Sequence, residues 1–430
     1  MTSKALCLHN IFKPIFLFLL VFCFQIPIQL TIQGIHIRIS LFVIFVLFSI
    51  HIIEIISKKR IDKTLLRLYL WFYFLLFYYL IISGTNGLVD VDVCKYTCYG
   101  AIVLGGSFLL VEIFWLTFDL LFVEKVMFYF VASASVHGII MLLTLLSPSF
   151  SSFLYSYVLI DEDVLNYLEL GLRASGLFNS GLAILSFYNA MALTMGAFLF
   201  CLKKEPLGYT KILINFFILF SLVLGIAISG RTGLFIGLLG FCFLFVYSLL
   251  SRFRRQAFWN IFRLGLIALL FLLPLISWIY QTGGNANVQW LFEFAFKGGK
   301  TNSTEYIMNN MFFLPENAVS IFFGTGNFGR SDGLPRINSD LGYILMIHFS
   351  GLIGLILSLA FFAWIGREIF FDCYDARIRA LGVFFLSAMA LGNFKDVYFF
   401  SYSGYTQLFF VTTCLAIKVN RLKLEMAKTI

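Results

Sequence analysis

Two arginines set among glycine and serine are the residues of this chain best suited to chemistry. Residues 229–233 read Ser-Gly-Arg-Thr-Gly around Arg231, and residues 173–176 read Arg-Ala-Ser-Gly from Arg173. A guanidinium group carries a planar fork of N–H donors that matches the oxygens of a phosphate group two at a time. If distant segments bring such groups together, the expected ligand is an anion of the diphosphate type.

Each arginine also has a simpler interpretation. Arg231 would lie at the rim of a membrane and could extend its guanidinium to lipid headgroups. Arg173 follows an acidic stretch, residues 161–169, and could form a salt bridge with it. The sequence leaves these alternatives open.

A second polar group gathers between residues 330 and 340. Arg330 and Arg336 are followed by Asn338 and Asp340, immediately before an apolar run. A carboxylate near cations at a membrane face can act as a general base, so Asp340 is a candidate to take a proton. Aspartate is also a favoured residue at the start of a helix, and a capping role is equally compatible with its position.

Other motifs are weaker. Residues 324–329 match the glycine spacing of a dinucleotide-binding loop, but no strand–helix context surrounds them. Cys94 and Cys98 are expected in one external loop, where a local disulfide is an open possibility. A metal site there is disfavoured, because no histidine or further cysteine lies nearby.

The elements that must position these residues are membrane spans. The chain of 430 residues is 60% hydrophobic and only 12% charged, with a mean hydropathy of +0.93. A helix needs about 20 apolar residues to cross a bilayer. The composition therefore predicts an all-α polytopic membrane protein with about 12 transmembrane helices. The spans are expected at 14–30, 39–57, 67–83, 99–118, 126–146, 181–202, 211–228, 232–250, 257–280, 341–365, 378–394 and 401–418.

The break inside residues 211–250 follows from length. As one helix this apolar stretch would be about 60 Å long, twice the thickness of the bilayer core. It must turn, and the segment around Arg231 is the place where it can do so.

Charge distribution predicts the orientation. The net charge of +9 would suggest nucleic acid in a soluble protein. Here most basic residues fall in short loops on one side, so both termini are predicted to be cytoplasmic and no nucleic acid is expected. Two long loops, about 147–180 and 281–340, then lie outside, and loops of this length tend to carry function. Residues 1–430 are interpreted as a single integral domain whose first span is retained.

At this point the chain resembles the O-antigen polymerase and ligase superfamily of bacterial envelope enzymes. The resemblance covers the predicted topology and three segments taken in order. These are residues 173–178 at the end of the first long loop, the turn at 228–234, and the stretch from 323–326 through 340–343 to the spaced glycines of 351–354.

The resemblance favours the O-antigen polymerase (Wzy) family. Ligases carry a His–Asn-like pair before the paired glycines, and Asp340 and Leu341 stand at the corresponding positions here. Similarity to the family implies a GT-C-like helical fold and a glycosyltransferase that uses neither a nucleotide sugar, a cofactor nor a metal. The substrate would be an undecaprenyl-diphosphate-linked oligosaccharide at the periplasmic face of the bacterial inner membrane.

The implied roles follow the motifs. Arg173, Arg231 and Asp340 would be catalytic, and Arg330, Arg336, Asn338 and Gly176 would bind substrate. Membrane lipid is the expected surrounding partner, and the binding of a chain-length regulator is left open. The alternatives are an O-antigen ligase that transfers glycan to lipid A core and, among non-enzymes, a flippase for the same lipid-linked units.

Overall fold

The fold is taken from a computed structural model. It describes residues 3–429 except for 86, 88–89, 161, 170–172, 180, 202–208, 251–257, 264–265, 267–304, 307–308, 330–336 and 397–400. Arg330 and Arg336 therefore lie outside the described residues, as does most of the expected span at 257–280.

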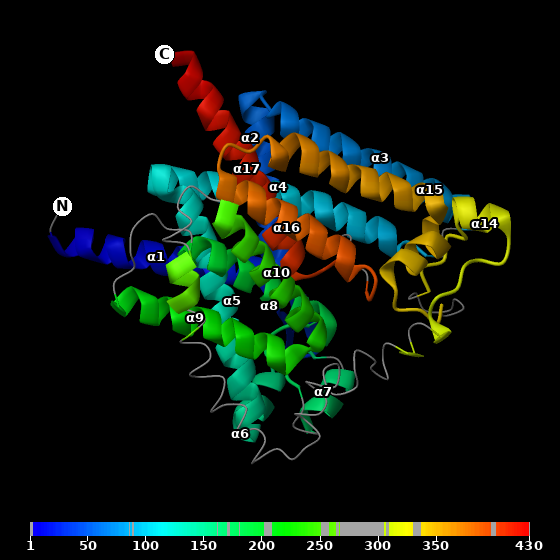
Figure 1. The fold of residues 1–430 in the computed structure, drawn as a ribbon, viewed down its shortest axis with the longest axis horizontal. Helices are drawn as coiled ribbons and strands as arrows, with labels where there is room; N and C mark the ends of the chain where they lie inside the picture. The colour runs from blue at the N-terminus through cyan, green and yellow to red at the C-terminus, as the bar shows by residue number, and fades with distance from the viewer. Residues whose placement is uncertain are drawn as a thin grey trace. The chain divides into compact units, whose positions relative to one another are not determined.

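The described part of the chain is a multi-pass α-helical membrane protein. Seven of its helical stretches are long and apolar enough to cross a membrane, and one of these, residues 92–146, contains two helices, α4 and α5. The long helices (Figure 1) are α1 (Ser3–Gln25), α2 (Ile39–Lys58), α3 (Lys63–Thr85), α4 (Asp92–Phe118), α5 (Phe122–Leu146), α8 (Leu182–Cys201), α9 (Tyr209–Ser229), α10 (Arg231–Leu250), α15 (Gly342–Ile365), α16 (Ala376–Gly392) and α17 (Gly404–Thr429). Most begin and end within a few residues of the expected spans, whereas the total of twelve stays a prediction.

Two expectations for the N-terminal part of the chain, the end of the first span and the position of Cys94 and Cys98, are corrected. The first span ends at Gln25 rather than at residue 30, because β1 (Gln29–Ile32) and β2 (Ile35–Arg38) form an antiparallel hairpin that pairs Gln29 with Arg38. Cys94 and Cys98 lie within α4 rather than in a loop, and both are free thiols.

The chain divides into two compact units, each built from separated segments. Unit 1 comprises residues 1–50, 106–274 and 403–411, and unit 2 comprises residues 51–105, 275–402 and 412–430. The expectation of one integral domain stays a prediction.

In unit 1, α8 packs against α5, α9 and α10. Small residues permit these contacts, as is common between membrane helices. A Cβ atom at Gly138 of α5 would lie 2.6 Å from the carbonyl oxygen of Ser221 in α9. Ser135 and Ser221 also share a hydrogen bond of 2.6 Å between their hydroxyl groups. Backbones in this unit therefore approach closely, and polar side chains of the spans bond to one another.

The first long loop is folded onto the hairpin. Ser147 caps α6 (Pro148–Tyr155), and α7 (Glu162–Glu169) follows. Val158 pairs with Leu30 of β1 as an isolated bridge. A small hydrophobic cluster then joins the loop to the start of α8, formed by Val158, Ile160, Val164 and Leu182. The loop therefore has a fixed position over the ends of the spans.

In unit 2, α3 and α15 run side by side in opposite directions (Figure 1). The Tyr79 hydroxyl bonds to Ser358 Oγ at 2.6 Å, and the Phe72 and Phe361 rings lie 5.1 Å apart. Residue numbers thus fall along α15 as they rise along α3, which defines the antiparallel arrangement.

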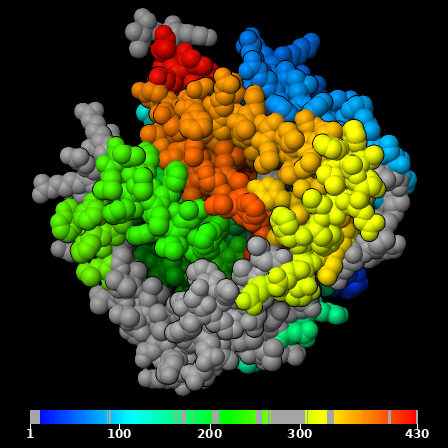
Figure 2. Space-filling view, turned by 45° about the vertical axis from the view of Figure 1, so that its right-hand side comes forward, coloured from blue at the N-terminus to red at the C-terminus, as the bar shows by residue number. Residues whose placement is uncertain are grey.

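Helix α15 is interrupted at Gly351, whose φ of 68° and ψ of −177° are not helical. The residues after α14 (Ala318–Phe323) fill the interruption, since the N–H groups of Thr325 and Gly326 donate to the carbonyls of His348 and Phe349 at 2.7 and 2.9 Å. Figure 2 shows this segment (yellow) on the surface against the orange helices of unit 2. The backbone of the glycine motif at 324–329 thus forms hydrogen bonds with α15, and no strand lies beside the motif among the described residues.

We predict that Gly351→Ala destabilises the protein by about 2 kcal/mol or more. The backbone at Gly351 has a conformation that is almost exclusive to glycine, and a Cβ atom there would lie 2.2 Å from the Phe322 carbonyl oxygen. Gly34→Ala is the matched control, because Gly34 also has a positive φ, of 81°, but has nothing within 4 Å. Thermal unfolding of the detergent-purified variants should show a clearly larger decrease in melting temperature for Gly351→Ala than for Gly34→Ala. Equal decreases would contradict the role of Gly351 in packing residues 322–326 on α15.

Candidate functional site

The segments around Arg173 and Arg231 lie at the same end of unit 1. At this end α5 finishes, α8 begins and α9 turns into α10. We call it the loop end of unit 1. The turn between α9 and α10 consists of Gly230 alone, so Arg231 opens α10, as the length of the apolar stretch predicts.

Close packing on α8 fixes the Arg231 segment. The Gly233 N–H donates to Ser186 Oγ at 3.1 Å. A Cβ atom at Gly233 would lie 2.2 Å from the Ser186 carbonyl oxygen, so only glycine permits this approach. Gly230 also faces Ser186, since a Cβ atom at Gly230 would lie 3.3 Å from the Ser186 hydroxyl oxygen. The backbone that carries the half-buried Arg231 is therefore held against the second turn of α8.

Contacts to α5 and α8 fix the Arg173 segment. The Leu177 N–H donates to His137 Nε2 of α5 at 3.2 Å, and the Phe178 ring stacks on Tyr188 of α8 at 5.7 Å. Gly176 has a φ of 61°, and a Cβ atom there would lie 3.1 Å from His137 Nε2. Gly176 is thus needed for a tight turn against α5, a structural role beside the substrate-binding one expected from sequence.

The hairpin supplies a third arginine to the loop end. Gln29 Oε1 accepts hydrogen bonds from Asn179 Nδ2 at 2.6 Å and from Arg38 Nε at 3.3 Å. Asn179 N–H also donates to the Pro27 carbonyl at 3.2 Å. The segment carrying Arg173 is therefore tied at its far end to the strands.

Buried polar atoms collect beneath these segments. His137 Nδ1, Asn189 Oδ1 and Thr232 Oγ1 have no hydrogen-bond partner in the described structure. Gln25 faces Tyr188, and Ser175 faces Tyr155, but neither pair reaches hydrogen-bond geometry. His137 and Asn189 lie about 10–14 Å along their helices from the loop end. A buried polar group left unsatisfied costs about 1–3 kcal/mol. Water or a hydroxyl-rich ligand is the expected partner of these atoms.

Tyr155 at the end of α6 borders the same group. Burial raises the pKa of its phenol, while the Ser175 hydroxyl and the backbone amides of Ser175 and Gly176 favour the ionised form and oppose that rise. The Tyr155 hydroxyl does not reach hydrogen-bond geometry with any described residue. It therefore stays protonated at neutral pH and remains available as a donor.

The remaining candidates belong to unit 2. Asp340 and Asn338 are both exposed. Asp340 does not cap α15, because the residue at the cap is Leu341 and its N–H donates to Ser339 Oγ at 3.2 Å. Arg330 and Arg336 lie outside the described residues, as do the acidic side chains of residues 161, 163 and 169. The salt-bridge alternative for Arg173 therefore stays open.

The sequence interpretation missed the polar residues under the arginines. His137 and Asn189 lie in the middle of apolar stretches, where polar side chains are costly and commonly functional. That rule could have found both. Gln25, within the expected span 14–30, carries the same signal, whereas Ser186 carries none, because its importance arises from contacts between separate helices.

Comparison with protein-family models, with curated proteins and with solved structures found no match for this chain.

We predict that His137→Leu frees the Arg173 segment. Leucine removes the acceptor of the Leu177 N–H and should cost about 1–3 kcal/mol. Hydrogen exchange of the Leu177 amide should become at least about tenfold faster, which corresponds to about 1.4 kcal/mol of local opening. His137→Gln keeps an acceptor and should retain most of the protection, and His36→Leu, at an exposed histidine of β2, serves as the control. Unchanged exchange in His137→Leu would contradict this role.

Proposed function

We propose that this chain is an O-antigen polymerase, which joins undecaprenyl-diphosphate-linked oligosaccharide units at the periplasmic face of the bacterial inner membrane. The observation that carries the proposal is the loop end of unit 1. There, two arginine–glycine segments far apart in sequence both pack on the first two turns of α8, above buried polar atoms that form no hydrogen bond within the described part of the chain.

The chemistry of the loop end suits a diphosphate attached to a sugar. Arg173 and Arg231 would hold the diphosphate, since guanidinium groups bind phosphate oxygens in pairs. The unpartnered atoms beneath them, among them Tyr188 Oη and Asn189 Oδ1, would bond to sugar hydroxyls or to water. The membrane location suits a lipid-linked substrate, which would reach the site from within the bilayer.

The reaction is a transfer of a glycan chain between lipid carriers. A hydroxyl oxygen of the acceptor unit attacks the anomeric carbon of the donor, and the bond from that carbon to the diphosphate breaks. The diphosphate leaves with the electron pair, and its charge is stabilised by the two arginines. The acceptor proton passes to a carboxylate, for which Asp340 is the candidate. Asn338, Arg330 and Arg336 would bind the second lipid-linked unit.

A polymerase is favoured over a ligase by residues 340 and 341. The pair expected of a ligase is replaced by Asp340 and Leu341. A flippase would need polar residues lining a central path. Most buried polar atoms of unit 1 that lack a hydrogen bond within the described residues instead gather toward the loop end, with Ser107 and Ser133 as exceptions.

We predict that Arg173→Ala and Arg231→Ala each abolish long-chain polysaccharide and leave core with a single unit. The measurement is a lipopolysaccharide gel from a deletion strain complemented with each variant at equal membrane levels. The lysine variants should restore part of the ladder if charge suffices and none if bidentate binding is needed. Arg367→Ala, at an arginine whose side chain is 85% exposed, is the control and should give a normal ladder.

The deletion strain itself separates the alternatives. Loss of a polymerase leaves core plus one unit, whereas loss of a ligase leaves bare core. Loss of a flippase leaves lipid-linked units on the cytoplasmic face. Normal ladders from both arginine variants would remove the catalytic assignment.

A further inference from the structure

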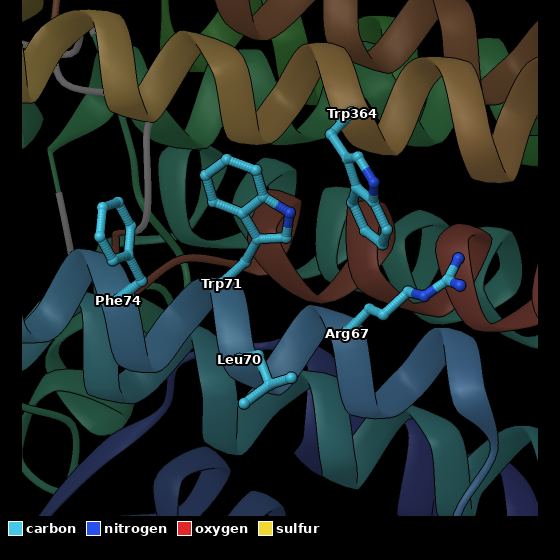
Figure 3. Close-up of a pocket in the computed structure, with 5 residues that line it drawn as sticks. All are labelled: Arg67, Leu70, Trp71, Phe74 and Trp364. Atoms are coloured by element: carbon cyan, nitrogen blue, oxygen red, sulfur yellow. The ribbon is translucent and has the colours of Figure 1, made fainter.

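An aromatic groove runs between α3 and α15 in unit 2, apart from the site proposed above. It has a volume of about 350 Å³ and is lined by Arg67, Leu70, Trp71, Phe74 and Trp364. Figure 3 shows Trp71 and Trp364 projecting into the space between the two helices, with Phe74 toward one end and the Arg67 guanidinium beyond Trp364 toward the other.

The residues of α3 that line the groove follow helical spacing. Arg67, Trp71 and Phe74 are separated by four and three residues, so they share one face of the helix. Trp71 packs against α15, with its ring 6.0 Å from Phe361 and 6.4 Å from Trp364. Leu70 and Phe74 remain 57% and 48% exposed, so the groove is open along an apolar side.

Among the residues that the structure describes, Arg67 is the only charged one that lines the groove. Its side chain is exposed, and it forms no hydrogen bond or ion pair with any residue that the structure describes. Nearby charges have partners of their own: the Asp62 carboxylate accepts from the N–H groups of Thr64 and Leu65 at the start of α3, and Arg367 pairs with Glu368. An apolar groove therefore ends at a cation without a counter-ion.

The neighbouring sequence adds to this positive charge. Residues 58–67 contain five basic side chains and one acidic one. Trp364 is the next-to-last residue of α15, close to the helix-end level at which tryptophan is enriched in membrane proteins, and Trp71 lies about two turns from the start of α3. Basic pockets between membrane helices at this level bind anionic lipid headgroups.

We propose that this groove is a binding site for one anionic phospholipid. The phosphate pairs with Arg67, and an acyl chain lies along Trp71, Trp364 and Phe74. The exposed apolar wall suits a chain that continues into the bilayer, and the unpaired guanidinium selects a headgroup with net negative charge over a zwitterionic one. The proposal does not depend on the reaction catalysed at the loop end.

The test is native mass spectrometry of the full chain, stripped of lipid in detergent and titrated with phosphatidylglycerol or with phosphatidylcholine of the same acyl chains. Wild-type protein should bind one phosphatidylglycerol at least about tenfold more tightly than phosphatidylcholine. Arg67→Gln should remove that difference, and Arg67→Lys should keep part of it. Arg367→Gln, at a paired arginine outside the groove, should behave as wild type.

A second variant tests the apolar residues of the groove that would contact the acyl chain. Trp364→Ala should weaken the binding of both lipids, because it shortens the apolar surface without changing charge. Thermal unfolding of each variant without lipid shows whether it is folded before titration. The proposal fails if Arg67→Gln binds phosphatidylglycerol as tightly as wild type. It fails equally if a second copy of the chain occupies the groove. In that case the mass spectrum of the wild type would show a dimer, and the dimer would be absent for Trp364→Ala.

Discussion

The structure depends on one constraint, the need to satisfy backbone polar groups wherever a helix is interrupted in a setting without water. The interruption of α15 at Gly351 would expose the carbonyls of His348 and Phe349, and the N–H groups of Thr325 and Gly326 take them up. The break at Gly230 is closed by the Gly230 N–H bond to the Ile226 carbonyl and by the packing of Gly233 on Ser186. Glycine is required at these contacts because the approaching group is backbone, which cannot move aside.

The same constraint explains why the candidate site is where it is. Closing the break after α9 brings the Arg231 segment onto α8. The Leu177 bond to His137 of α5 and the Phe178 ring on Tyr188 of α8 bring the Arg173 segment to the same end of unit 1. Polar atoms of α1, α5 and α8 then remain buried beneath both segments without a hydrogen bond to any residue that the structure describes. Such atoms are costly in an apolar interior, and their accumulation beneath two arginines is the strongest physical reason to regard this end of unit 1 as functional.

The polar surface of unit 1 and the apolar groove of unit 2 suit different kinds of ligand. Unit 1 offers unpartnered oxygen and nitrogen atoms, which suit a hydroxyl-rich ligand. The groove of unit 2 offers aromatic rings and one unpaired guanidinium, which suit a lipid with a charged headgroup. The difference lies in what surrounds each arginine: the loop end gathers hydrogen-bonding groups around Arg173 and Arg231, whereas Arg67 has rings on one side and solvent on the other.

The sequence by itself determined the membrane class and most helix bounds, because an apolar stretch of about 20 residues has few other stable states. It also located the break at Gly230, since the bilayer thickness limits helix length. It erred at Gln25, where hydropathy continues but the chain enters a hairpin, because strand pairing with residues 35–38 is not a local property. Only the tertiary structure decided that Asp340 is exposed and does not cap α15, that Gly351 breaks α15, and that His137, Gln25 and Ser186 border the arginine segments. Those outcomes rest on contacts between residues tens to hundreds of positions apart, which hydropathy and spacing along one helix do not encode.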